Sequence, residues 1–252
     1  MLKVELHTHT DLDPSDAIPY STRELIDHAA RLQYQAIAVT LHDRYFDSTD
    51  STDSTDSTDS TDSTDSTADA AYARDRGVTL ISGIERTIGG KHVLLLNFSA
   101  ACASVESFGD LATLKHAEPG GLVVAPHAMY PHPSAIGRKL LDRHADLIDA
   151  LEVNALYTRI SDFNRPAIAW ARERGKPLVG NSDLHTLDQL GRTYSLVDAQ
   201  ATPDAICAAI RAGRVEVRTE PLSVARAGWV FGRMVVEGLA GRGQRLLGSR
   251  RD

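Results

Sequence analysis

The chain has 252 residues, of which 42% are hydrophobic and 24% charged, a composition typical of a globular protein that buries a core. Its formal net charge is −7, and the seven aspartates of residues 47–67, seven copies of the triplet Asp-Ser-Thr, account for all of it. The rest of the chain is electrically balanced, which argues against a protein that grips long nucleic acid through its phosphates.

Seven segments are predicted to be strands because each is a short, nearly continuous apolar run, as expected for strands buried on both faces. They are residues 3–7, 36–42, 78–85, 92–98, 121–127, 149–154 and 176–183. The tract at residues 47–67, which follows the second of them, has no apolar residue, so we expect it to be a disordered acidic loop insertion.

Helical patterns lie between the strands. Ser21 and Glu24 are spaced as a capping box at the start of one helix. Gly175 ends a second helix, and Thr202 followed by Pro203 opens a third. This alternation of strands and helices predicts an α/β fold with a parallel sheet or barrel.

One connection departs from the alternation. Residues 86–91, RTIGGK, are too few for a crossover helix and predict a hairpin between the third and fourth strands. This connection argues against a regular eightfold barrel, and we predict a distorted (β/α)7 barrel over residues 1–198. Residues 199–252 are predicted to form a C-terminal helical extension.

Histidines and carboxylates stand at the carboxyl ends of these strands. The residues in question are His7, His9, His42, Glu85, His127, Asp183 and His185. In parallel α/β folds these strand ends form one rim, where ligands and catalytic groups gather. His92 begins the fourth strand, and the hairpin would place it beside Glu85 on the same rim.

The clustering of these residue types predicts a metal site. A lone histidine near a strand end is more often structural, but imidazole and carboxylate groups together are the ligands of Zn²⁺, Mn²⁺ and Fe²⁺. The other histidines lie in helical patterns or a Pro-rich region and receive no metal role; they are His28, His116, His132 and His144. Cys102 and Cys207 are interpreted as packing residues, and two cysteines make no disulfide framework.

Six short motifs occur in the order seen in the polymerase and histidinol phosphatase (PHP) family. They are HTHT (7–10), TLHD (40–43), GIE (83–85), KHVLLL (91–96), APH (125–127) and NSDLH (181–185). Residues 2 to about 198 therefore resemble this family, specifically as a set although each motif alone is weak. The resemblance implies a distorted seven-stranded barrel, two or three divalent metal ions (Zn, Mn or Fe) and phosphoester hydrolysis.

The resemblance also implies three sets of ligands. His7, His9, Glu85 and Asp183 would hold one ion; Glu85 would bridge to a second, with His92 and His127; Asp16, His42 and His185 would hold a third. Asp16 shares its stretch with Asp11 and Asp13. The family commonly has Asp before the histidine that is His42 here, whereas this chain has Leu41.

The resulting expectation is a metal-dependent phosphatase of small phosphorylated metabolites or nucleotides, with a metal-bridging hydroxide as nucleophile. Glu85, Asp183 and His185 are the expected catalytic residues, and Arg159 and Arg192 the expected phosphate contacts. Three alternatives stay open: a nuclease or exonuclease on short oligonucleotides, a metal-dependent amidohydrolase, and a non-catalytic metal-binding module.

The expected location is the cytoplasm, because no signal stretch begins the chain and no apolar run reaches the roughly 18 residues of a membrane span. Residues 223–252 mix six arginines with apolar residues. We interpret them as a helix packed on the barrel, with contact to a membrane surface as the alternative.

Overall fold

Two five-stranded sheets form the centre of the protein. The structure is a computed structural model, and it describes residues 1–48, 66–228 and 230. The first sheet has the order β10-β9-β1-β2-β3, with β1 (Leu2–Glu5), β2 (Ala36–Ala38), β3 (Thr79–Ile81), β9 (Thr193–Val197) and β10 (Val215–Thr219). The second has the order β4-β5-β6-β7-β8, with β4 (Gly83–Ile88), β5 (Lys91–Leu96), β6 (Leu122–Ala125), β7 (Ala150–Asn154) and β8 (Leu178–Asn181).

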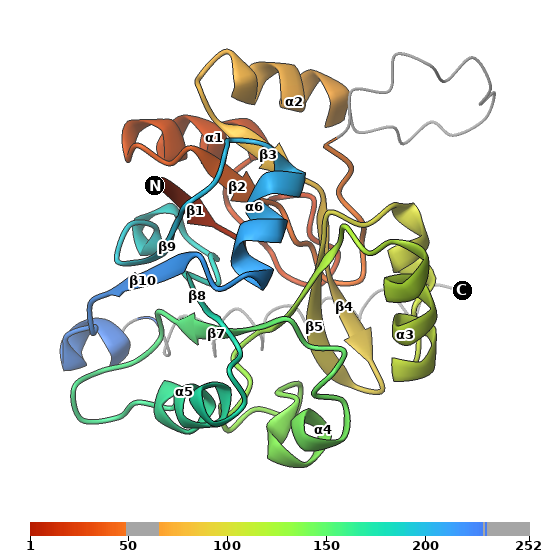
Figure 1. The fold of residues 1–252 in the computed structure, drawn as a ribbon. Helices are drawn as coiled ribbons and strands as arrows, with labels where there is room; N and C mark the ends of the chain where they lie inside the picture. Colours follow the sequence, from red (N-terminus) through yellow and green to blue (C-terminus); the bar gives the residue numbers. More distant parts are fainter. Residues whose placement is uncertain (49–65, 229, 231–252) are drawn as a thin grey trace, which may run out of the picture.

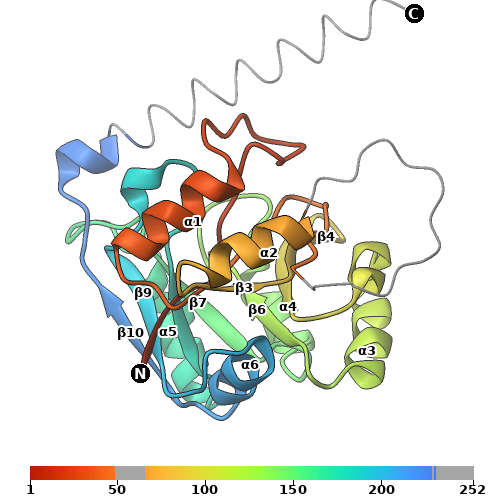
Figure 2. The same ribbon diagram turned by 90° about the horizontal axis from the view of Figure 1, so that it is seen from above.

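Helices surround the sheets. They are α1 (Thr22–Arg31), α2 (Ser66–Arg74), α3 (Phe108–Ala117), α4 (Gly137–Arg143), α5 (Asn164–Glu173) and α6 (Pro203–Arg211), with short 3₁₀ turns η1 (Ala100–Ser104) and η2 (Leu187–Gln189). Helices α1 and α2 lie side by side on one side of the molecule, and α4 and α5 lie on the opposite side (Figures 1 and 2). The described residues contain no helix that is both long and apolar enough to cross a membrane.

The predicted helix starts are confirmed. Ser21 accepts a hydrogen bond from the Glu24 amide, and the Glu24 carboxylate accepts one from the Ser21 amide, so the capping box before α1 is complete. Thr202 caps α6 and Pro203 occupies its first turn.

The hairpin between β4 and β5 is also confirmed. The two strands pair antiparallel with Glu85 opposite Leu94 and Thr87 opposite His92. Gly89 and Gly90 form the turn with φ of 57° and 76°, a backbone region that glycine enters without steric cost.

The detail of a (β/α)7 barrel is not confirmed, because no continuous ladder closes the described strands into one barrel. Parallel pairing is interrupted by the antiparallel pairs of β9 with β1, β4 with β5 and β5 with β6. Isolated bridges nevertheless join the two sheets, between Thr8 and Leu184 and between His42 and Glu85. The fold is thus mixed α/β, and the bridges bring ends of strands from both sheets together.

Residues beyond 198 do not form a purely helical extension. After α6, residues 215–219 form β10, which pairs antiparallel with β9, itself paired with β1. Ile206, Cys207 and Ile210 of α6 are fully buried in a core cluster with Val4 and Val124. The expected helix over the basic tail falls almost entirely outside the described residues.

The expected disordered tract at residues 47–67 needs correction at both ends. Asp47 and Ser48 are described, and the Ser48 amide donates to the Ser82 hydroxyl at 2.9 Å. Helix α2 begins at Ser66, inside the last triplet. Residues 49–65, which hold the rest of the predicted loop, lie outside the described residues.

Candidate metal centre

Glu85, from strand β4, is the central carboxylate of a buried histidine cluster. Its Oε2 atom lies 3.3 Å from Nε2 of His7, 3.5 Å from Nε2 of His9 and 3.1 Å from Nε2 of His42. His7 and His9 follow β1 and His42 follows β2, so three imidazoles from the first sheet converge on one oxygen from the second.

The other oxygen of Glu85 faces two different imidazoles. Oε1 lies 2.7 Å from Nδ1 of His92 and 3.2 Å from Nε2 of His127. His92 reaches Glu85 diagonally across the hairpin, as the short turn predicted, because diagonal neighbours on antiparallel strands lie within reach of long side chains. A carboxylate whose two oxygens face separate groups of nitrogens has the geometry that bridging two cations requires.

Asp183 enters the same cluster after β8. Its Oδ1 atom lies 3.5 Å from Nε2 of His7, 3.7 Å from Nε2 of His9 and 3.6 Å from Nδ1 of His185. Asp183 has a φ of 51° and His127 one of 32°, a left-handed backbone that costs a non-glycine residue on the order of 1–3 kcal/mol. Such strain is concentrated where a side chain must be aimed at a functional site.

Asp16 and Asp13 come from the loop before α1 and have different environments. Asp16 Oδ2 lies 3.2 Å from Nε2 of His185 and 3.7 Å from Nδ1 of His42. Asp13 Oδ2 instead accepts from Nδ1 of both His9, at 2.8 Å, and His42, at 3.0 Å. Asp13 therefore orients two imidazoles with their Nε2 atoms toward Glu85, as carboxylates behind metal-ligating histidines do.

Two buried glutamates behind the cluster were missed by the sequence analysis. Glu152 of β7 lies 2.8 Å from Nδ1 of His7, which leaves Nε2 of His7 to face Glu85 and Asp183. Glu5 of β1 accepts hydrogen bonds from the amides of His7 and Ser182, and burial raises the pKa of Glu5 to about 8. The available signal was a carboxylate inside an apolar strand, which rarely stays buried without partners.

Burial and neighbouring charges shift the pKa values of the cluster in opposite directions, and the neighbouring charges have the larger effect. Burial disfavours charge on Glu85 and Asp183, but the surrounding imidazoles outweigh it and hold the pKa of both carboxyls well below the usual range. Burial likewise disfavours charged His42 and His185, but neighbouring carboxylates raise the pKa of each to about 9. Positive charge is thus favoured at this place, whether protons or metal ions supply it.

The donor set fits divalent cations. Three imidazole nitrogens that face carboxylates of the cluster are buried without a hydrogen-bond partner: Nε2 of His7, Nε2 of His9 and Nδ1 of His92. Nδ1 of His127 is also unpartnered, but His127 faces Glu85 with its Nε2 atom. Leaving such atoms unsatisfied costs about 1–3 kcal/mol each, and coordination to a metal ion removes that cost. Four groups of three residues could each surround an ion: His7–His9–Glu85, His9–Asp13–His42, His9–Asp183–His185 and His42–Glu85–His92.

The cluster opens into a cavity of about 520 Å³, a volume typical of small-molecule sites. Besides ligand candidates, its wall contains Ser15, Asp43, Thr87, Tyr130, Pro131, His132, Ser134, Asn154, Leu156 and Phe163. His132, expected to have no metal role, lies in this wall with Nδ1 2.6 Å from the Ser134 hydroxyl. None of the wall residues that the structure describes is Lys or Arg.

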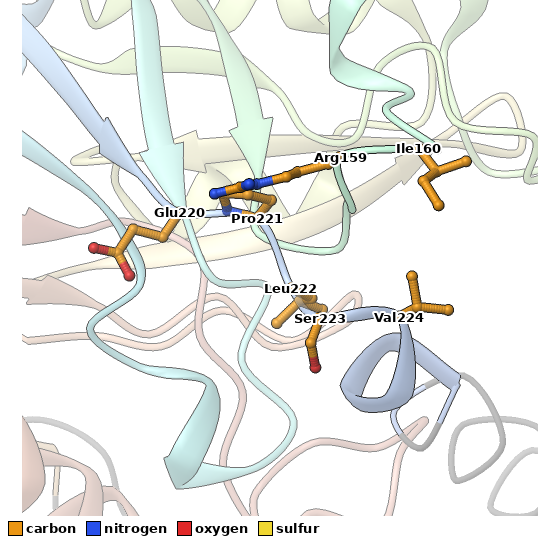
Figure 3. A pocket seen from close by; sticks show the side chains of 7 residues that line it. All are labelled: Arg159, Ile160, Glu220, Pro221, Leu222, Ser223 and Val224. Carbon is orange, nitrogen blue, oxygen red and sulfur yellow. The ribbon is translucent and has the colours of Figure 1, made fainter.

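The two arginines expected to contact phosphate do not line this cavity. Arg159 lines a separate hollow of about 740 Å³ with Ile160, Pro221 and Val224 (Figure 3). Arg192 lines another, between the segment after β7 and the turn η2. The structure therefore brings together all nine predicted metal ligands but neither arginine.

The remaining histidines and cysteines lie elsewhere. His28 is on α1, His116 on α3, and His144 stacks on Phe108 with ring centroids 4.1 Å apart. Cys102 and Cys207 are buried thiols in apolar core clusters, in keeping with a packing role.

Comparison with known proteins gives a family-model match for part of the chain and several structures of similar fold. A model described as PHP-associated matches residues 162–215, the stretch from α5 to the first residue of β10. By structure, the chain resembles a two-domain protein of Bacteroides vulgatus ATCC 8482 that contains a predicted PHP-like metal-dependent phosphoesterase, with a TM-score of 0.65 and 19% identity. The chain therefore shares its fold with PHP-like proteins, and residues 162–215 match the PHP-associated model. The matched region covers 87% of this chain but only 65% of the Bacteroides protein, which is longer.

Two further structures share the PHP-type fold. A protein of Bifidobacterium adolescentis ATCC 15703, proposed to be a metal-dependent phosphoesterase, aligns with a TM-score of 0.53 and 16% identity over 73% of this chain and 87% of its own. The lesion-specific endonuclease PfuEndoQ of Pyrococcus furiosus aligns with a TM-score of 0.54 and 15% identity over 86% of this chain and 57% of its own. No protein of curated function matches the chain by sequence. At these identities the likeness establishes the fold.

Proposed function

We propose that this chain is a metal-dependent phosphoesterase of the PHP type that acts on small phosphorylated substrates. The observation that carries the proposal is the set of buried, unpartnered imidazole nitrogens around Glu85, a residue that itself lines the cavity. Two or three divalent ions (Zn, Mn or Fe) would be held there. Such ions, when bound, acidify a water molecule and neutralise the charge that builds on a phosphoryl group.

The first two proposed ligand sets divide His7, His9, His92 and His127 between the two oxygens of Glu85, and the third includes His42, which also lies near Asp16. One ion would contact His7, His9, Glu85 and Asp183, since Nε2 of each histidine lies 3.3 to 3.7 Å from an oxygen of each carboxylate. A second would contact Glu85, His92 and His127. A third would contact Asp16, His42 and His185, because Asp16 Oδ2 lies near both histidines. Asp13 is a poorer ligand candidate, since the amides of Ser15 and Asp16 donate to its Oδ1 atom and its Oδ2 atom accepts from His9 and His42.

The chain's own residues prepare this centre. Asp13 and Glu152 fix the imidazole rings of His9, His42 and His7, so that the nitrogen facing Glu85 can offer a lone pair to an ion. Asn154 donates to Glu152 and to Asp183, at 2.7 and 3.2 Å. It thereby fixes the position of Asp183, a carboxylate of the cluster, relative to Glu152, which lies behind the cluster. Rigid support of this kind keeps ligand positions constant during turnover.

Phosphate contacts from Arg159 and Arg192 become part of the proposal only for substrates that extend beyond the cavity. A nuclease acting on short oligonucleotides is such a case, and the fold shared with PfuEndoQ makes it the second candidate. An amidohydrolase or a metal-binding module without activity has no separate observation in its favour.

Metal analysis combined with a substrate panel tests the proposal. After metal-supplemented expression, we expect at least two divalent ions per chain by elemental analysis. The panel holds p-nitrophenyl phosphate, a thymidine phosphodiester, short oligonucleotides and amides. We expect turnover of phosphoesters that is lost on chelation. Less than one ion per chain, or hydrolysis of amides alone, would contradict the proposal.

A further inference from the structure

An aromatic pair forms one side of the metal cavity. Tyr130 follows β6 and Phe163 immediately precedes α5, and both line the cavity. Their ring centroids lie 5.5 Å apart with an interplanar angle of 57°, a tilted contact of the kind that aromatic rings prefer.

The two rings differ in how firmly the protein holds them. The Tyr130 hydroxyl lies 3.1 Å from the carbonyl oxygen of Leu156 and 3.4 Å from Oδ1 of Asn164. Tyr130 also packs on the apolar cluster of Leu156, Leu222, Ala227 and Val230. Its ring is therefore a fixed backing for Phe163.

Phe163 is left uncovered. It remains 37% exposed, one of four large hydrophobic side chains that stand exposed among the described residues, and the only one of those four that lines the metal cavity. Exposing an aromatic ring to water is unfavourable, and a planar ligand that enters the cavity would remove that cost.

The charge of the cavity wall also favours a ligand with a planar apolar part. No Lys or Arg of the described residues lines the wall, so the wall offers no cation to a negatively charged substituent of the substrate beyond the cluster itself. Polar side chains of the wall can hydrogen-bond the part of the substrate that is not phosphate, while Phe163, Tyr130 and Leu156 offer it apolar and stacking contacts.

We infer that Phe163, backed by Tyr130, stacks on a planar heteroaromatic ring of the substrate, and that the preferred substrates are therefore nucleotides whose phosphoryl group faces the histidine cluster. The inference rests on the proposed phosphoesterase function and narrows it. Base stacking on an aromatic side chain tolerates any base, because every base has a π face. Phe163 is thus a specificity-determining residue for the class of substrate and not for one nucleobase.

Two phosphomonoesters that share a phosphate but differ in the ring test the inference. The kcat and KM of adenosine 5′-monophosphate and of glycerol 3-phosphate are measured for the wild type and for Phe163→Ala, Phe163→Tyr and Ile160→Ala. Loss of one stacking contact lowers affinity about tenfold or more. We expect Phe163→Ala to lower kcat/KM for the nucleotide about tenfold or more, through KM, and to change glycerol phosphate less than twofold.

The other variants serve as controls. Phe163→Tyr keeps a ring and should retain the preference for the nucleotide. Ile160 is also an exposed apolar residue, at 86%, and lies three residues earlier, but it lines the separate hollow with Arg159 (Figure 3), so Ile160→Ala should behave as the wild type. An equal loss for both substrates in Phe163→Ala would indicate a structural role, and no loss for either would also overturn the inference.

A binding measurement separates this inference from the proposed function. Calorimetry compares a non-hydrolysable adenosine phosphonate with methylphosphonate for the wild type and Phe163→Ala. We expect the adenosine compound to bind the wild type about tenfold or more tightly than it binds the variant. This result in a protein that hydrolyses no phosphoester would refute the proposed activity and keep the stacking site. Equal binding of the adenosine compound to both proteins would refute the stacking site even if phosphoesters are hydrolysed.

Discussion

Glu85 has a position that no other side chain of the cluster shares, because its two oxygens face separate groups of imidazoles. Five histidine nitrogens lie within 3.5 Å of this one carboxylate, three at Oε2 and two at Oε1. Removing its charge should therefore disturb two ions at once, whereas removing one histidine disturbs a single ion.

We predict that Glu85→Gln reduces turnover of a phosphoester by about a hundredfold or more, because replacing groups that only support metal ligands already costs 10- to 100-fold. Gln has nearly the same shape, so the circular dichroism spectrum should not change. His92→Ala is the comparison, and it should lose less activity and no more than one ion. Near-full turnover of Glu85→Gln would show that Glu85 does not bridge.

Asp13 allows a second test, because we expect it to orient the imidazole rings of His9 and His42 without binding a metal ion itself. Its Oδ2 atom accepts from the Nδ1 atoms of His9 and His42. Burial alone would raise the pKa of Asp13, but these two imidazoles outweigh burial and lower it. We predict that Asp13→Asn weakens metal affinity about 10- to 100-fold while saturating metal restores most of the activity. Asp11→Asn, two residues earlier on an exposed side chain, is the control. Loss that excess metal cannot restore would argue against a purely orienting role.

The metal-ligand candidates could be predicted from the sequence, but their supporting residues could not. His7 and Asp183 follow the ends of apolar strands, and a local pattern reveals that position. Glu85 ends an apolar run of the sequence, but the predicted strand 78–85 is divided between β3 and β4, and Glu85 lies inside β4. Glu152 lies inside an apolar run of β7, and only the fold shows that its carboxylate meets His7, which is 145 residues away along the chain. Arg159 was also misleading, since following a strand does not decide into which hollow a long side chain extends.

At the scale of elements, β8 and β9 approach each other unusually closely. A Cβ atom at Gly180 would lie 2.7 Å from the carbonyl oxygen of Tyr194. The Gly180 amide also donates to the hydroxyl of Ser195 at 2.9 Å, which explains why a polar side chain is buried in β9. Glycine here allows the two sheets to meet directly beside the strand that leads to Asp183.

We predict that Gly180→Ala destabilises the protein by about 1–3 kcal/mol, because the added methyl group must displace backbone and not a flexible side chain. Urea denaturation measures the loss. Gly109→Ala in α3 is the matched control, since its Cβ would meet nothing nearer than 3.5 Å and alanine favours a helix. An unchanged unfolding free energy for Gly180→Ala would mean that the sheets can separate without cost.

The sequence predicted elements that depend on neighbouring residues better than elements that depend on contacts between distant parts of the chain. The β4–β5 hairpin followed from RTIGGK, and the α1 cap from Ser21 and Glu24, because neighbours in sequence determine both. Strands β9 and β10 were missed: their burial alternates or is partial, so neither forms the continuous apolar run that marked the others. Strand β9 pairs with β1 and β10 pairs with β9, and these long-range contacts are not visible in a local pattern.

At the scale of the molecule, the candidate metal centre connects the two ends of the fold. His7 and His9 come from the first strand, whereas Asp183 and His185 follow β8, and the bridge between Thr8 and Leu184 holds the two segments side by side. An ion bound by both segments binds the native state and not the unfolded chain, so it stabilises the fold by mass action. Chelation should accordingly lower the melting temperature.

We predict that the decrease in melting temperature caused by chelation becomes larger as the pH rises from 6.5 to 9. In the metal-free protein the pKa of His42 and of His185 is about 9, above the unfolded value near 6.5, so their pairs with carboxylates stabilise fully below pH 6.5 and fail as the pH passes 9. Glu5, with a pKa of about 8, acts in the same direction because the folded state holds its proton longer than the unfolded chain does. Ligands that have lost their protons bind metal better, so the metal-loaded protein should keep its stability over the same range.

Melting temperatures measured between pH 6 and 9, with and without chelator, decide this prediction. The difference between the two curves should widen toward pH 9 in the wild type. Asp183→Ala removes a carboxylate that contacts His7, His9 and His185, so it should lower the metal content and shrink the difference at every pH. A difference that stays constant with pH, or one that Asp183→Ala leaves intact, would show that stability does not depend on an ion held between the first strand and the segment after β8.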